Sequence, residues 1–219
     1  MKDLRRRTIT GFVYAAVVLG AAFGAPIVFT VLVAVALGLG LGELWDLRRA
    51  RVVAAVQLLV LVVGAGCLLI LRSLGDRGAA HGAGAGLPVW LLLAIGATWA
   101  ADIGAYAIGS VAGRRKIAPR ISSGKTWEGT FGGFGGAALA VLGISALFGL
   151  GRPEAAIAAV TIGPAAFAGD LLESLLKRRA GVKDSGTLFP GHGGMLDRVD
   201  SLLVVAPLVA VLTVAAGLG

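Results

Sequence analysis

Long apolar stretches constrain this chain more than any other feature. They cover residues 8–24, 26–46, 52–71, 87–109, 130–150, 155–176 and 199–218. A helix needs about 20 apolar residues to cross the roughly 30 Å hydrocarbon core of a bilayer. A water-soluble globule is excluded because 57% of the residues are hydrophobic and only 15% are charged. The sequence therefore predicts an all-α, polytopic integral membrane protein with about seven transmembrane helices.

The predicted spans form two parts of one structural domain. Residues 1–90 hold the N-terminal transmembrane helices, and residues 91–219 hold a C-terminal core with two polar loops, at 110–129 and 177–198. The first span is short and the link at 24–26 is tight. A re-entrant pair formed by the first two spans is therefore an alternative.

The positive charges predict the orientation. Of the 20 Lys and Arg residues, only Arg72, Arg77 and Arg152 fall outside if the N-terminus is cytoplasmic. This split obeys the positive-inside rule. We expect a protein of the plasma membrane with its N-terminus and both polar loops inside. Topology also explains the net charge of +8, so no nucleic-acid partner is expected.

Small residues spaced four apart indicate close helix packing. Packing within one chain is favoured over a homodimer, which stays an alternative. Cys67 lies alone in an apolar run and is interpreted as a packing residue. The pairs are Gly20 with Gly24, Gly38 with Gly42, Gly129 with Gly133, and Gly132 with Gly136.

Carboxylates inside apolar spans or at the entry to one suggest function, because charge in a membrane is costly. These residues are Asp102, Asp170, Glu173, Asp197 and Asp200. Asp170 and Asp197 would repel one another at membrane depth unless a cation lay between them. Carboxylate oxygens suit Mg²⁺, so a divalent-metal site is the preferred interpretation. For Glu173 the alternative is an intrahelical pair with Lys177, four residues on.

The segment Ser123–Thr126 resembles the end of a phosphate-binding loop. That motif is rejected because its first glycine would fall at Pro119 and no flanking strand is expected. Lys125 and Thr126 remain candidates for phosphate contact, with Glu128 orienting them. The alternative is a solvated loop that caps the fifth helix.

His192 lies in a Pro-Gly-His-Gly-Gly run, which predicts a tight turn rather than helix. The glycines favour close backbone approach to a ligand. A purely structural histidine is the equal alternative.

Residues 174–200 resemble the signature of the phosphatidate cytidylyltransferases, also called CDP-diglyceride synthases. Segments 102–106, 125–129 and 169–174 resemble further parts of that family, so the resemblance covers about residues 98–205. One departure is the loop 122–126, where the family commonly has a further basic residue and a proline.

The resemblance implies CMP transfer from CTP to phosphatidate, giving CDP-diacylglycerol and pyrophosphate, with Mg²⁺ and possibly a second cation. It implies catalytic roles for Asp170, Asp197, Asp200, Lys125 and Lys177, the three aspartates being the metal ligands. Asp102 and Glu173 would support the site. The expected substrate-binding residues are Lys125, Thr126, Glu128, Lys177, Arg178, Lys183, Asp184, His192 and Arg198.

Two other functions remain open. One is a CTP-dependent enzyme acting on another lipid, such as a CDP-archaeol synthase or a polyprenol kinase, of which the long signature disfavours the kinase. A non-enzymatic transporter could use buried carboxylates as an ion site. Transport predicts charges along a whole path through the bilayer, whereas here they stop at one face.

Overall fold

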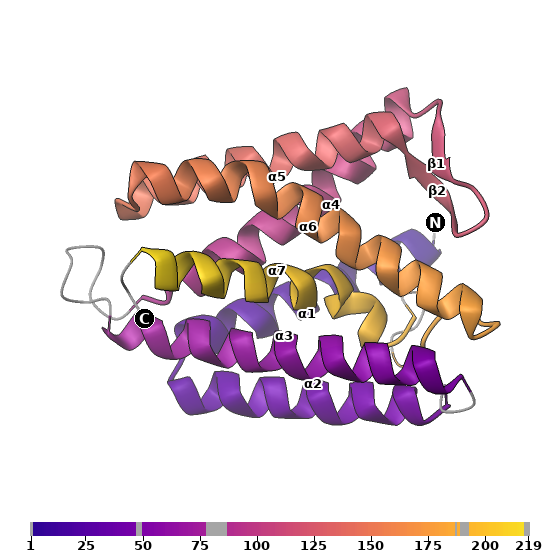
Figure 1. The fold of residues 1–219 in the computed structure, drawn as a ribbon, viewed down its shortest axis with the longest axis horizontal. Helices are drawn as coiled ribbons and strands as arrows, with labels where there is room; N and C mark the ends of the chain where they lie inside the picture. Colours follow the sequence, from indigo (N-terminus) through magenta and orange to yellow (C-terminus); the bar gives the residue numbers. More distant parts are fainter. Residues whose placement is uncertain (1, 47–49, 78–86, 187, 189–192, 217–219) are drawn as a thin grey trace.

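The chain folds into a bundle of α-helices, seen in a computed structural model (Figure 1). The structure describes residues 2–46, 50–77, 87–186, 188 and 193–216. Within them, six helices are long and apolar enough to cross a membrane, and the apolar part of α1, Thr10–Phe23, is shorter. This confirms the all-α polytopic class. The helices are α1 (Lys2–Phe23), α2 (Pro26–Asp46), α3 (Arg51–Arg77), α4 (Val89–Ala112), α5 (Trp127–Phe148), α6 (Arg152–Arg179) and α7 (Leu196–Ala215).

Several helices run past the predicted spans into polar sequence. Helix α3 continues to Arg77, and α6 begins at Arg152 and ends at Arg179. The apolar run marks only the part of a helix suited to hydrocarbon, whereas backbone hydrogen bonding continues into charged sequence. Hydropathy therefore locates these helices correctly but makes them too short.

A small β-hairpin joins α4 to α5. Strands β1 (Lys116–Ala118) and β2 (Ser122–Thr126) pair antiparallel, with Lys116 opposite Thr126. The expectation that no strand flanks Ser123–Thr126 is therefore wrong. Strands this short do not show the alternation that reveals a strand in sequence. Rejection of the phosphate-loop motif still holds, because β2 runs directly into α5 with no glycine loop between them.

Helix α4 changes its environment halfway along its length. Its first half supplies fully buried side chains, among them Leu91, Leu93 and Ile95. From Asp102 onward most of its residues are exposed. The buried half anchors α4 in the main core, whereas the second half packs against α5 and is otherwise exposed.

Glycines let α4 and α5 touch backbone to backbone. A Cβ added at Gly104 would lie 2.5 Å from the Gly132 carbonyl oxygen, and one at Gly133 would lie 2.9 Å from that of Ala101. The predicted packing within one chain is thus confirmed for the glycine pairs of α5. By contrast, a Cβ at Gly20, Gly38 or Gly42 meets open space. The homodimer stays a prediction.

This packing predicts a stability difference between neighbouring glycines. Gly136→Ala should lower the free energy of unfolding by about 1–3 kcal/mol, because its methyl group would overlap the Ala100 carbonyl oxygen. Gly135→Ala is the matched control, since a Cβ there meets nothing within 4 Å. Thermal unfolding of the two purified variants in detergent measures the difference. Equal unfolding temperatures would contradict this packing.

The polar segments gather at one end of the bundle. Figure 1 shows the hairpin, the N-terminal part of α1, the end of α2 and the end of α6 at the same end. The ends of α5 and α7 lie at the other. The charged residues of both polar loops can therefore act together.

Candidate active site

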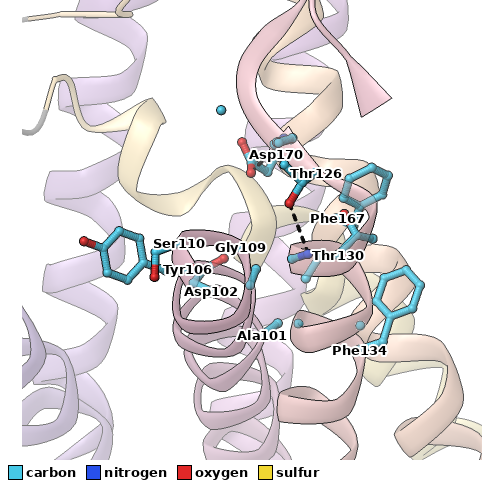
Figure 2. Close-up of a pocket in the computed structure, with 17 residues that line it drawn as sticks. Ala101, Asp102, Tyr106, Gly109, Ser110, Thr126, Thr130, Phe134, Phe167 and Asp170 are labelled. Atoms are coloured by element: carbon cyan, nitrogen blue, oxygen red, sulfur yellow. Dashed lines mark hydrogen bonds and ion pairs between the residues drawn. The ribbon is translucent and has the colours of Figure 1, made fainter. Parts of the chain in front are cut away.

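A cavity of about 370 Å³ lies between α4, α5, α6 and β2. Figure 2 shows Asp102 and Tyr106 of α4 on one side and Phe134 and Phe167 on the other. The space exists because the helices present small residues to it. These residues are Ala101, Ala105, Gly109, Gly129, Gly133, Gly163 and Ala166.

An ion pair forms the polar wall of this cavity. The Nζ of Lys125, on β2, lies 2.7 Å from the Oδ2 of Asp170, on α6. The Lys125 side chain is only 15% exposed, whereas that of Asp170 is 41% exposed. Lys125 also lies 5.5 Å from the centroid of the Phe167 ring. A lysine held this way can exchange its carboxylate partner for a phosphate without leaving its place.

Further carboxylates lie around Asp170. Asp102 interacts electrostatically with Asp170 and with two cations, Arg198 and Lys125. Asp200, on α7, interacts with both Asp170 and Asp102. Side chains from α4, α6 and α7 therefore converge on one charged region.

The predicted magnesium site can be tested against these donors. No group of three or more His, Cys, Asp or Glu side chains suited to a metal occurs among the described residues. Mg²⁺ is usually held by one or two carboxylates together with substrate phosphates, so a complete protein cage is not required. Asp170 suits that role because its carboxylate lines the cavity and is partly exposed. The donors present fit Mg²⁺ bound jointly with a phosphorylated substrate.

Asp197 has a different environment. One of its oxygens pairs with Lys177, across the contact between α6 and α7. Its Oδ2 accepts hydrogen bonds from the backbone nitrogens of Ser185 (3.0 Å) and Gly194 (2.8 Å) and from the Ser185 hydroxyl (3.0 Å). The Asp197 side chain is only 7% exposed. One oxygen thus joins α6 to α7, and the other holds the α6–α7 loop against α7.

Lys177 and Glu173 interact electrostatically, but the close ion pair of Lys177 is not the intrahelical one considered from the sequence. Lys177 reaches across to Asp197 instead. Glu173 is buried and accepts a hydrogen bond from Gln57 of α3. Both side chains therefore tie α6 to its neighbours.

Glu43, on α2, lies close to the α6–α7 loop and was missed by the sequence interpretation. Its Oε1 accepts from the backbone nitrogen of Met195 (2.6 Å), and its Oε2 accepts from that of Leu196 (3.0 Å) and from the Ser185 hydroxyl (2.8 Å). A Cβ at Gly194 would lie 2.5 Å from either Glu43 oxygen. The signal was present, because Glu43 is a carboxylate inside a predicted apolar span.

The hairpin is fixed by residues that had been interpreted as phosphate ligands. Thr126 is the N-cap of α5 and accepts from the Gly129 backbone nitrogen at 3.2 Å. Glu128 accepts from the backbone nitrogens of Arg114 (3.0 Å) and Arg115 (3.2 Å). Arg178 donates to the Ile121 carbonyl at 3.1 Å. These contacts hold β2, and with it Lys125, at the cavity.

The remaining predicted residues are spread over the same end of the bundle. Lys183 and Asp184 are exposed in the loop after α6. Arg198 is exposed and lines a separate cavity. His192 lies outside the described residues.

Comparison with known proteins gives several relatives. A phosphatidate cytidylyltransferase of Pseudomonas aeruginosa is 44% identical over 126 residues, which are 55% of this chain and 46% of that protein. One of Synechocystis is 48% identical over 122 residues, 54% of this chain and 41% of that protein. An uncharacterized Escherichia coli protein, YnbB, is 47% identical over 125 residues, which are 57% of this chain and 41% of that protein. The chain thus spans less than half the length of the relatives it matches.

The family model describes the part of the chain that builds the cavity. The model of the cytidylyltransferase family matches residues 80–216, which is more than half of the 219 residues. The matched range includes α4, the hairpin, α5, α6 and α7 and excludes Glu43 and all of α1. The chain belongs to the cytidylyltransferase family.

Proposed function

We propose that this protein transfers CMP from CTP to phosphatidate, giving CDP-diacylglycerol and pyrophosphate. The observation that carries the proposal is a cavity in which the mostly buried Lys125 pairs with the partly exposed Asp170, in the range matched by the family. Two of the relatives reported above bear the name of this activity. The proposal extends that name to a chain covering only part of them.

The reaction needs electrostatic help more than a strong base. Phosphatidate is a phosphomonoester whose second ionisation lies near about pH 6, by analogy with phosphoamino acids. Its dianionic oxygen forms a bond to the α-phosphorus of CTP, and the bond from that phosphorus to the oxygen bridging to the β-phosphate breaks. The electron pair leaves with pyrophosphate. No proton moves, so the main barrier is repulsion between two anions.

We assign the nucleotide to the cavity beside Lys125. Its ammonium group would bind the triphosphate, with Thr126 and Glu128 holding the strand that carries it. Asp170, with Asp102 and Asp200 nearby, would hold Mg²⁺ together with the substrate phosphates. Bound there, the ion would neutralise charge on the α-phosphate and the leaving pyrophosphate. Lys177 and Asp197 would keep the α6–α7 loop in place around the site.

The direct test is incubation of purified protein with labelled CTP, Mg²⁺ and phosphatidate. We expect lipid-linked CMP and pyrophosphate in equal amounts. Parallel reactions with an archaeal ether-linked phosphate and with a polyprenol distinguish the alternative lipid substrates. Absence of both products from folded protein would refute the proposal. A transporter is disfavoured because the two polar segments, the hairpin between α4 and α5 and the end of α6, lie at the same end of the bundle.

We further propose that the end of the bundle that holds the hairpin and the end of α6 faces the cytoplasm. In a Cys67→Ala background, Lys183→Cys should be labelled by an impermeant thiol reagent only after cells are opened, because the positive-inside rule places this loop inside. His81→Cys is the opposite-side control and should be labelled in intact cells. Labelling of position 183 from outside would reverse the assignment.

A further inference from the structure

A second cavity, of about 360 Å³, lies against a different face of α4. Its walls come from α1, α4 and α7. Asp102 lines this cavity and also the one that contains Lys125. The two cavities therefore meet at a single carboxylate. The other lining residues are Thr10, Gly11, Tyr14, Ala15, Trp99, Ile103 and Arg198.

We propose that this second cavity binds the lipid substrate, with an anionic phosphomonoester head against Arg198 and the apolar chains between α1 and α4. The inference rests on the proposed function, because it places the second substrate of that reaction. It assigns a binding role to α1, which lies outside the range matched by the family.

The charges support a division between two substrates. Arg198 is the cation among the residues lining the second cavity, and Lys125 is the cation among those lining the first. Asp102 interacts electrostatically with both. Two anionic substrates repel one another, so each needs its own cation close to the point where they meet. Lys125 and Arg198, on either side of Asp102, provide this arrangement.

The apolar walls favour a lipid over a nucleotide. Ile103 is 69% exposed, and Tyr14 and Trp99 pack with their ring centroids 6.0 Å apart. The Tyr14 hydroxyl lies 3.4 Å from the Arg198 carbonyl oxygen, so its polar end points toward the charged end of the cavity. Aromatic side chains with one polar end are typical of the membrane interface. A lipid with a phosphate head and acyl chains matches a cavity that is polar beside Arg198 and apolar beside Ile103 and Trp99.

The glycines of α1 allow a matched test. Gly11 lines the cavity and a Cβ added there meets nothing within 4 Å, so Gly11→Leu places its side chain in the cavity. Gly20 is equally open and does not line the cavity, which makes Gly20→Leu the control. Labelled dioleoyl phosphatidate binding is measured with each purified protein in phosphatidylcholine nanodiscs, without CTP. We expect about tenfold weaker binding for Gly11→Leu and wild-type binding for Gly20→Leu.

Kinetics supply an independent measurement. Gly11→Leu and Arg198→Gln should each raise the KM for phosphatidate about tenfold and leave the KM for CTP unchanged. If Gly11→Leu fails to fold, Arg198→Gln alone decides the outcome. Wild-type binding and KM in the folded variants would overturn the inference while the proposed function stands. A rise in the KM for CTP instead would assign the cavity to the nucleotide and overturn it as well.

Failure of the proposed function looks different. Wild-type protein would then transfer no CMP to phosphatidate. Loss of phosphatidate binding in Gly11→Leu but not in Gly20→Leu would still support a lipid-phosphate site. Equal binding by all three proteins would refute that site whatever the enzyme activity.

Discussion

Asp170→Asn should reduce CMP transfer about a hundredfold or more while leaving the unfolding temperature near that of the wild type. Asn keeps the shape of the side chain but removes the negative charge and one acceptor oxygen. The change leaves Lys125 without its anion, but it also removes repulsion between Asp170 and the carboxylates of Asp102 and Asp200. Because Asp170 is itself 41% exposed, these opposing effects leave the stability of the folded state nearly unchanged. The transition state would lose a ligand for the charge-neutralising cation, which is a large electrostatic effect. Steady-state kinetics and thermal unfolding of the same preparation measure both quantities.

Asp197→Asn is the contrasting variant. It would leave Lys177 without its anion in a contact where the Asp197 side chain is 7% exposed and that of Lys177 is 13% exposed. We expect loss of activity together with a loss of stability on the order of 3 kcal/mol. If the two aspartates instead share one catalytic metal, as the sequence predicts, the double variant should cost little more activity than either single one. Near-normal activity of Asp170→Asn would contradict its assignment.

Glu43→Ala should lower both stability and activity although Glu43 lies outside the range matched by the family. The change removes the acceptor for two backbone N–H groups at the start of α7 and for the Ser185 hydroxyl. Buried donors left without partners cost free energy, here about 3 kcal/mol in total. The loop that Asp197 holds against α7 would also lose its support from α2.

Kinetics and unfolding together test Glu43 as a positioning residue. We expect kcat to fall more than tenfold with KM values changing less, because a displaced loop misaligns bound substrates. Glu154→Ala is the matched control, since Glu154 is an acidic residue in the first turn of α6, at the other end of the bundle. It should cost less than about 1 kcal/mol. Equal effects of the two variants would show that Glu43 has no special role.

The sequence predicts much of this site because charge in an apolar span is a strong signal. Asp102, Asp170, Glu173, Asp197 and Asp200 were all identified that way. Lys125 was identified from its polar loop and from the family resemblance. The structure adds that Lys125 and Asp170 share one cavity.

The partners of these residues could not be predicted, because they depend on how the helices are rotated against one another. The sequence offers Glu173 as the partner of Lys177, four residues away, yet Lys177 pairs with Asp197 on another helix. Glu43 contacts backbone 152 residues further along the chain. The hairpin was missed because strands of three and five residues leave too little pattern. Local spacing identifies the charged groups, and tertiary packing decides which of them meet.

The backbone contact between α4 and α5 has a consequence for genetic screens of this protein. Since a side chain at Gly104 or Gly136 would collide with a backbone carbonyl, every substitution there should be harmful, even the smallest. A growth-based saturation screen would therefore rank these glycines beside Asp170 and Lys125. Protein abundance separates the two classes, because glycine variants should disappear from the membrane whereas Asp170 variants should accumulate normally. Without the abundance measurement, a screen of mutational tolerance would overestimate the extent of the catalytic centre. It would include the glycines along the whole contact between the two helices.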